Sequence, residues 1–238
     1  MSMRENKPYV SHKTLSPDEP EYWQFSFDEM GRYDVAACID HVLNATGAPK
    51  LTVVAFSQGT LTNFILHSTR PEYSKKVSLL IAYGPVGNIT HIKPPVNLVM
   101  PFVPTLMTRI PVYFGHFPIG SSVQNFLHFY QIYKAKNLVM YDHGEEENRR
   151  RYGQATPPQY PLERIRLPIA LFSSQGDILA DTSDVADLAY RLGSNIVLNY
   201  IVPQPSFCHQ DFVNGYRAND ILHNIAIELA KKYSSQNL

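Results

Sequence analysis

Short apolar runs alternate along most of the chain with stretches in which apolar residues recur every three or four positions. The runs predict buried strands at residues 51–56, 77–85, 167–177 and 195–202. The periodic stretches predict helices over residues 26–46, after residue 57, from about residue 183, and from about residue 220 to 233. Strands that alternate with helices indicate an α/β fold, in which a mostly parallel sheet is covered by helices on both faces.

The helix over residues 26–46 has clear signals at both ends. Ser26 and Glu29 have the spacing of a capping box, and Phe25 with Met30 has the spacing of a hydrophobic staple. Gly47 follows the last periodic residue, as is typical of a helix C-terminus.

Residues 88–160 interrupt the alternation of strands and helices. They hold eight of the 18 prolines, an apolar stretch at residues 96–107 and an amphipathic segment from residue 122 to about 140. Long insertions in compact domains are often lids, so we interpret residues 88–160 as a cap within a single domain of residues 1–238. The alternative is that the insertion packs against its own domain.

Charge and composition narrow the class of protein. The formal net charge is zero and the hydrophobic content is 44%, which is typical of a globular chain without the basic surface of a nucleic-acid binder. No stretch of 18 apolar residues predicts a membrane span, and the N-terminus lacks the apolar core of a signal peptide. The dense charges at residues 145–151 mix both signs and predict a solvated face.

Two sequons and two cysteines add little to this picture. Asn44 and Asn88 each begin an Asn-x-Thr sequence in a predicted loop, which favours glycosylation and the secretory route. Cys38 and Cys208 form neither a disulfide framework nor a metal cluster. We expect Cys38 in the core and Cys208 packed beneath its neighbour His209.

Ser57 lies between the predicted strand at residues 51–56 and the following helix. A serine on such a turn matches the strained elbow on which α/β-hydrolases expose their nucleophile. Gly59 fits the second glycine of the Gly-x-Ser-x-Gly pattern, where a missing side chain lets helix and strand approach closely. Ala55 takes the place of the first glycine.

A serine hydroxyl needs a base and an orienting acid to become a nucleophile. The order serine, acid, histidine along the chain is that of α/β-hydrolases. Asp177 follows the predicted strand at residues 167–177, and His209 lies in the loop after the strand at residues 195–202. Both positions predict side chains at the carboxyl edge of the sheet, near Ser57.

Other titratable residues are weaker candidates for these roles. Asp181 and Asp184 fall at the start of the next helix, where aspartate commonly caps. Asp211 is expected to tether the histidine loop or to cap a helix. His67 and His223 fall on helices and are interpreted as surface or packing residues.

The chain resembles the acid lipase family of α/β-hydrolases, the group of lysosomal acid lipase and gastric lipase. The resemblance rests on five blocks that occur in the family's order, "LSPDEPEYWQFSFDEMGRYDVAACIDHVLNATG" (15–47), "SQGTLTNFILHSTRPEY" (57–73), "GSSVQNFLHFYQ" (120–131), "GDILADTSDV" (176–185) and "CHQDFVNG" (208–215). It implies Ser57 as nucleophile, Asp177 as orienting acid, His209 as general base, and the backbone N–H of Gln58 as an oxyanion donor. It also implies neutral lipid esters as substrates at a lipid–water interface, no cofactor, and a lysosomal or secreted location.

Three departures from the family pattern accompany this resemblance. Ala55 and Phe56 replace the family's usual glycine and histidine. The family's early strands, and the His-Gly segment with the other oxyanion donor, have no counterpart here, so residues 51–56 are expected to form an exposed apolar edge. The cap also looks short. These departures suggest a truncated form, such as a splice variant or an incomplete gene model.

Three functions remain in competition on this sequence. The first is a serine ester hydrolase that cleaves triacylglycerol or cholesteryl ester through an acyl-enzyme. The second is a catalytically silent, lipase-like protein that binds lipid or a partner. The third keeps the triad but makes the protein a thioesterase, peptidase or acyltransferase, because the fold alone does not fix the acyl group. Neither metal-ligand spacing nor a phosphate-binding loop is present in the sequence.

Overall fold

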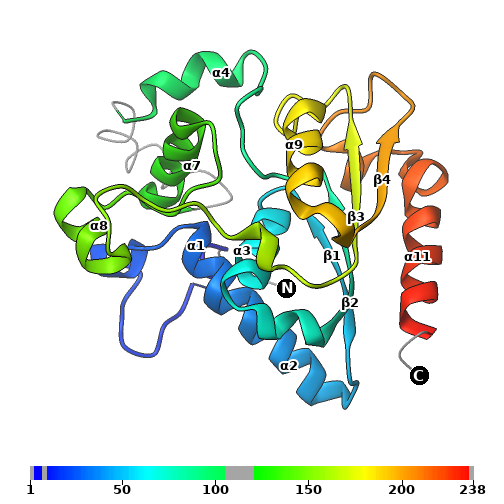
Figure 1. The fold of residues 1–238 in the computed structure, drawn as a ribbon, viewed down its shortest axis with the longest axis horizontal. Coiled ribbons are helices and arrows are strands. Elements are labelled where there is room, and N and C mark those ends of the chain that lie inside the picture. The colour runs from blue at the N-terminus through cyan, green and yellow to red at the C-terminus, as the bar shows by residue number, and fades with distance from the viewer. Residues whose placement is uncertain (1–2, 7–9, 105–120, 236–238) are drawn as a thin grey trace.

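A computed structural model describes residues 3–6, 10–104 and 121–235 of the chain. At its centre is a parallel sheet of four strands in the order β1-β2-β3-β4 (Figure 1). The strands are β1 (Leu51–Phe56), β2 (Val77–Tyr83), β3 (Ile169–Ser174) and β4 (Ile196–Val202). All four predicted strands are therefore present, and the predicted α/β class is confirmed.

Alternate residues of the central strands enter two separate cores. Leu80 and Ala82 of β2 belong to the larger core, whereas Leu79 and Ile81 of the same strand belong to the smaller one. This alternation follows from the two-residue period of a strand, and it shows that helices cover both faces of the sheet.

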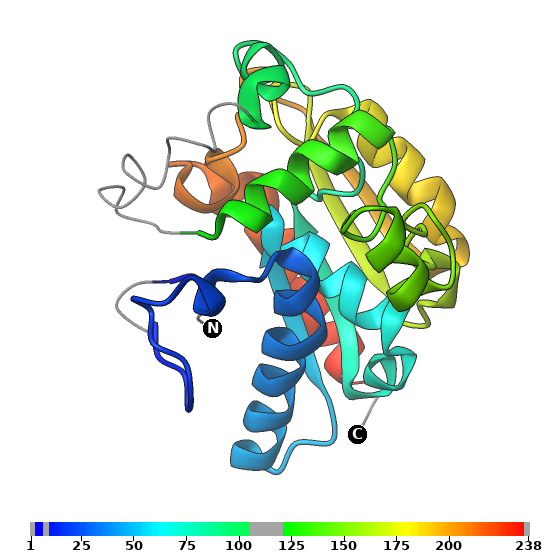
Figure 2. The same cartoon turned by 90° about the vertical axis from the view of Figure 1, so that its left-hand side faces the viewer.

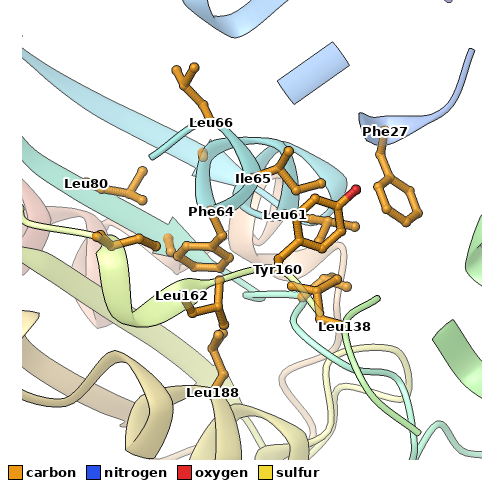
Figure 3. Close-up of a cluster of buried hydrophobic side chains, with 14 of the residues drawn as sticks. Phe27, Leu61, Phe64, Ile65, Leu66, Leu80, Leu138, Tyr160, Leu162 and Leu188 are labelled. Atoms are coloured by element: carbon orange, nitrogen blue, oxygen red, sulfur yellow. The ribbon is translucent and has the colours of Figure 1, made fainter. Parts of the chain in front are cut away.

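Three main helices cover the face of the larger core, namely α2 (Ala36–Thr46), α3 (Gln58–Thr69) and α9 (Thr182–Leu192). Phe64 of α3, Leu188 of α9 and Leu80 of β2 all belong to this core (Figure 3). Short 3₁₀ turns complete the connections on this side, at η3 (Pro71–Lys76), η5 (Leu162–Arg164) and η6 (Gly193–Asn195).

The opposite face is covered by the C-terminal part of the chain. The π-helical turn η7 (Asn219–His223) leads into α11 (Asn224–Ser235), which lies across the sheet from α2, α3 and α9 (Figures 1 and 2). Leu222 and Ala226 are buried in the smaller core, together with Phe212 of the short helix α10 (Asp211–Asn214).

The N-terminal helix forms with the predicted caps. After the short turn η1 (Pro20–Trp23), it runs as α1 (Phe27–Glu29), the π-helical turn η2 (Met30–Val35) and α2 without a break in the chain path. The capping box of Ser26 and Glu29 is present, and Gly47 ends the helix with φ +68°. Both end signals are thus confirmed.

The described part of the insertion at residues 88–160 is mostly helical. It contains α4 (Val96–Val99), η4 (Met100–Phe102), α7 (Val123–Ala135) and α8 (Glu145–Tyr152). Leu138 and Tyr160 are fully buried against α3 in the larger core, so this end of the insertion packs into the domain (Figure 3). Residues 105–120 of the predicted cap lie outside the described residues, and the cap itself stays a prediction.

The structure corrects expectations about the burial of β1, Cys38 and Cys208 and about the position of Asn44. Strand β1 is an edge of the described sheet and is only partly buried, with Val54 60% exposed. This exposure corrects the burial predicted from the apolar run and agrees with the exposed apolar edge expected from the departures from the family pattern. Cys208 is exposed and does not pack beneath His209, because the loop turns its side chain to the surface; Cys38 is half-buried. Asn44 lies in the last turn of α2, within the predicted helix of residues 26–46, and not in a loop.

Candidate active site

Each strand of the sheet delivers one part of the site at its carboxyl end. Ser57 follows β1, Gly84 follows β2, Asp177 follows β3 by a short turn, and His209 follows β4 by a longer loop. The carboxyl ends of parallel strands lie on one edge of a sheet, which is where α/β proteins bind their ligands. Residues that lie far apart in the sequence are therefore brought together at this edge of the sheet.

Ser57 occupies a strained backbone position. Its φ of +53° and ψ of −125° are rare for a residue with a side chain, and its N–H donates to the carbonyl oxygen of Tyr83 at 3.0 Å. The strain comes from the sharp passage from β1 into α3, and it turns the hydroxyl away from the helix. Ser57 thus sits on the elbow that the sequence predicted.

A continuous line of hydrogen bonds joins the three residues that the sequence selected. His209 Nε2 lies 2.8 Å from Ser57 Oγ, and His209 Nδ1 lies 2.6 Å from Asp177 Oδ2. If the carboxylate accepts from Nδ1–H, then Nε2 is free to accept the serine proton. The arrangement therefore has the geometry of a nucleophile, a base and an orienting acid.

The acid is held by its own loop. Asp177 is completely buried, and its Oδ1 accepts from the N–H groups of Leu179 and Ala180 at 2.8 and 2.9 Å. These bonds fix the orientation of the carboxylate and leave Oδ2 for the histidine. A side chain at Gly176 would meet the carbonyl oxygens of Pro205 and Phe207 at 2.6 and 2.7 Å, so glycine lets the acid loop touch the histidine loop.

Two of the three alternative acids, Asp181 and Asp211, have the structural roles expected of them, whereas Asp184 does not cap a helix. Asp181 caps α9 through the N–H of Ser183, and Asp211 accepts from the N–H of Cys208 at 2.7 Å and so tethers the histidine loop. Asp184 is buried and binds His91, with 2.7 Å between Oδ1 and Nδ1. This second Asp–His pair was not foreseen from the sequence.

Two contacts at the site were also missed by sequence reasoning. Gly84 has φ +51°, and a Cβ atom there would lie 3.0 Å from Cε1 of His209. Phe56 places its ring against that of His209. Gly84 belongs to no motif, and Phe56 was noted only as a departure from the family pattern, so only the proximity of strand ends could have predicted these contacts. By contrast, a Cβ atom at Gly59 would make only an ordinary contact with Ala55 at 3.9 Å, so close packing does not explain this glycine.

The predicted oxyanion donor lies directly after the elbow. Gln58 is the first residue of α3, where backbone N–H groups have no partner within the helix. The predicted sequons lie elsewhere: Asn44 is exposed on α2, and Asn88 is in the loop after β2, where its Nδ2 donates to Asp187 Oδ2 at 3.1 Å. Glycosylation of either residue stays a prediction.

Within the described residues, no group of three or more His, Cys, Asp or Glu side chains is arranged to hold a metal ion. None of the helices in the same part of the chain is both long and apolar enough to cross a membrane.

The parallel sheet and the elbow place the protein in the α/β-hydrolase class. A monoacylglycerol lipase from Paleococcus ferrophilus has a similar fold, with a TM-score of 0.53 and 15% identity over 88% of this chain and 76% of that one. No family model matches the sequence.

Comparison with curated proteins identifies the family. The chain is 33% identical to the lysosomal acid lipase/cholesteryl ester hydrolase of Rattus norvegicus, over 93% of this chain and 68% of that protein. It is also 33% identical to the gastric triacylglycerol lipase of Bos taurus, over 92% of this chain and 67% of that protein. The chain belongs to the acid lipase family, and it is a carboxylic ester hydrolase.

Proposed function

We propose that the protein hydrolyses neutral lipid esters, with Ser57 as nucleophile, His209 as general base and Asp177 as the acid that orients the histidine. The observation that carries this proposal is the line of hydrogen bonds from Ser57 Oγ through both nitrogens of His209 to the buried carboxylate of Asp177. Serine is a poor nucleophile without such partners.

The reaction proceeds in two halves. Ser57 Oγ attacks the ester carbonyl carbon while its proton passes to Nε2 of His209, and the negative charge on the carbonyl oxygen is stabilised by the N–H of Gln58. The ester C–O bond then breaks, and the leaving alcohol takes the proton from His209. In the second half, His209 takes a proton from water, the hydroxide attacks the acyl-enzyme, and the fatty acid leaves as Ser57 regains its proton.

Neutral lipid esters, either triacylglycerol or cholesteryl ester, are the substrate class that we propose. The names of the relatives from Rattus norvegicus and Bos taurus support this choice. Leu98 and Phe102 in α4 and η4 add a structural argument, because these large apolar side chains are 65% and 62% exposed. An exposed apolar surface on residues 88–160 suits a cap that meets a lipid–water interface. Because the chain belongs to the same family as these relatives, we also propose a lysosomal or secreted location.

The decisive test is labelling of the purified chain with a fluorophosphonate probe, with Ser57→Ala as the control. We expect labelling of the wild-type protein and none of the variant, together with hydrolysis of triolein or cholesteryl oleate emulsions that Ser57→Ala abolishes. Hydrolysis of short esters but of neither emulsion would contradict the substrate class while keeping the esterase.

The silent, lipid-binding alternative makes the opposite prediction. A folded wild-type sample that binds lipid vesicles without labelling or turnover would overturn the proposed function in its favour. The hydrogen-bonded line through His209 supports the active form, because a silent protein has no need to keep three polar groups aligned.

A further inference from the structure

Both polar atoms of the Gln58 side-chain amide are hydrogen-bonded. Nε2 donates to Oε1 of Glu5 at 2.8 Å and lies 3.6 Å from Sδ of Met30, and Oε1 accepts from Nδ2 of Asn125 at 2.8 Å. Both amide hydrogens and the carbonyl oxygen are therefore used. Segments far away in the sequence thus fix the residue that directly follows Ser57.

These contacts close into a ring. Nδ2 of Asn125 also donates to Oγ of Ser121 at 3.1 Å, and this hydroxyl donates to Oε2 of Glu5 at 2.5 Å. The ring Glu5–Gln58–Asn125–Ser121 thus joins the N-terminal segment, the first residue of α3 and the start of α7. A polar network in which each member has its partners permits one arrangement and is rigid.

The ring is anchored in the protein interior. Asn125 is only 2% exposed, and its Oδ1 accepts from the N–H of Phe27 at 2.7 Å. Glu5 is 9% exposed and, within the described residues, forms no ion pair, while its neighbour Arg4 binds Asp34. Burial raises the pKa of the Glu5 carboxyl. Neutral donors on Gln58 and Ser121 thus hold this carboxyl in place.

We propose that Gln58 is a positioning residue through its side chain: the ring Glu5–Gln58–Asn125–Ser121 fixes the peptide whose N–H stabilises the oxyanion. The inference rests on the proposed function, because the donor matters only if Ser57 attacks an ester. A preorganised donor stabilises the transition state because it is already held in the right position. Disrupting the ring should therefore weaken stabilisation of the transition state more than binding of the substrate. The ring also ties the donor to the residues at which α7 begins.

A charge swap around the ring tests this role. Gln58→Glu places two carboxyl groups against each other and removes the amide that Glu5 accepts from. The double variant Glu5→Gln/Gln58→Glu restores the ring in mirrored form, because the new amide at position 5 donates to the new carboxylate at position 58. That carboxylate still accepts from Asn125, and the new amide oxygen still accepts from Ser121.

The measurements are kcat and KM for a p-nitrophenyl ester, the second-order rate of fluorophosphonate labelling, and Tm. For Gln58→Glu we expect kcat and the labelling rate to fall roughly 10- to 100-fold, with KM changed less than about threefold, at a temperature well below Tm. The double variant should regain both rates to within about threefold. Tyr160→Phe is the matched control, since it removes a buried hydroxyl that donates to Asp28 and to no member of the ring, and it should alter Tm alone.

The outcomes separate this inference from the proposed function. Rates for Gln58→Glu equal to wild type, or a loss that the folded double variant does not repair, would overturn the positioning role. Wild-type protein without labelling or turnover at Ser57 would overturn the proposed function itself, before any ring variant is compared.

Discussion

The ring of Phe56 packs against the ring of His209, with 4.7 Å between the ring centroids and 36° between the planes. Phe56 is the last residue of β1 and directly precedes Ser57, so one strand end both carries the serine and supports the histidine. Because the bond from Nε2 to Oγ depends on the tilt of the imidazole ring, this contact is expected to set the geometry of proton transfer.

Truncation of this ring is the first prediction. Phe56→Ala should lower kcat roughly 10-fold, since a small displacement of a reacting group can cost up to about 100-fold in rate. Phe56→His keeps a planar ring at the same place and should stay within about threefold of wild type. Steady-state kinetics on a p-nitrophenyl ester would check both variants, and full activity of Phe56→Ala would show that His209 needs no support from this side.

Gly84 leads to a second prediction, because it faces the pair of His209 and Asp177. An added Cβ atom would lie 3.0 Å from Cε1 and 3.1 Å from Nδ1 of His209, and 3.3 Å from Oδ2 of Asp177. Gly84→Ala should therefore displace the imidazole and lower kcat about 100-fold. Alanine is also strained at the φ of +51° that Gly84 adopts. Gly84→Ala should therefore lower the free energy of unfolding by roughly 1–2 kcal/mol.

A matched control separates this clash from backbone strain. Gly153 ends α8 with φ +75°, and a Cβ atom there would meet nothing within 4 Å. Gly153→Ala should therefore lose comparable stability in urea unfolding and keep wild-type kcat. Equal kinetic losses in the two variants would mean that strain, and not contact with the histidine, explains Gly84.

The sequence predicted what depends on local rules. The capping box at Ser26, the four strands and the elbow at Ser57 follow from short patterns, and the order of Ser57, Asp177 and His209 follows from a known topology. The capping box, the strands and the elbow were correct because each is determined by residues close in the chain. The three site residues meet because parallel strands share a carboxyl edge.

Long-range side-chain contacts were beyond such rules. Glu5 and Gln58 are 53 residues apart, and nothing in either neighbourhood predicts that they meet. The exposure of Cys208 and the pairing of His91 with Asp184 depend in the same way on how loops turn in space. Sequence reasoning selected the three candidate site residues and the tether Asp211, and it missed the more distant contacts made by Glu5 and Gly84.

Two buried histidines give a third prediction, on stability against pH. Burial lowers the pKa of His67 and of His128 to about 4. In the unfolded chain these groups have a pKa near 6.5, so between pH 6.5 and 4 the unfolded state binds more protons. The contribution of these two histidines to the free energy of unfolding should therefore be most favourable above pH 6.5 and fall as the pH drops to 4, by up to roughly 3 kcal/mol for each histidine.

A difference measurement isolates one of them. Burial raises the pKa of Glu5, Glu29 and Asp184, and these carboxyl groups favour the folded state as the pH falls. Their effect is shared by wild type and His67→Leu, so it cancels between the two urea titrations. Wild type should lose more stability than His67→Leu between pH 6.5 and 4; parallel curves would show that His67 does not stay neutral in the folded protein.

The free side of strand β1 gives the last prediction. Strand order places β1 at one end of the described sheet, paired with β2 alone, and Val54 is its most exposed large side chain. An apolar edge strand with unpaired backbone groups can add a strand from a second molecule, and lysine on such an edge blocks this pairing. Val54→Lys should thus slow aggregation at 40 °C, measured by light scattering, while the free energy of unfolding changes by only about 0.5 kcal/mol.

Tyr190→Lys is the comparison: this side chain of α9 is 86% exposed but lies on no strand edge. An equal gain from Tyr190→Lys would trace the aggregation to apolar surface in general, whereas a gain confined to Val54→Lys would locate it at the edge next to the elbow.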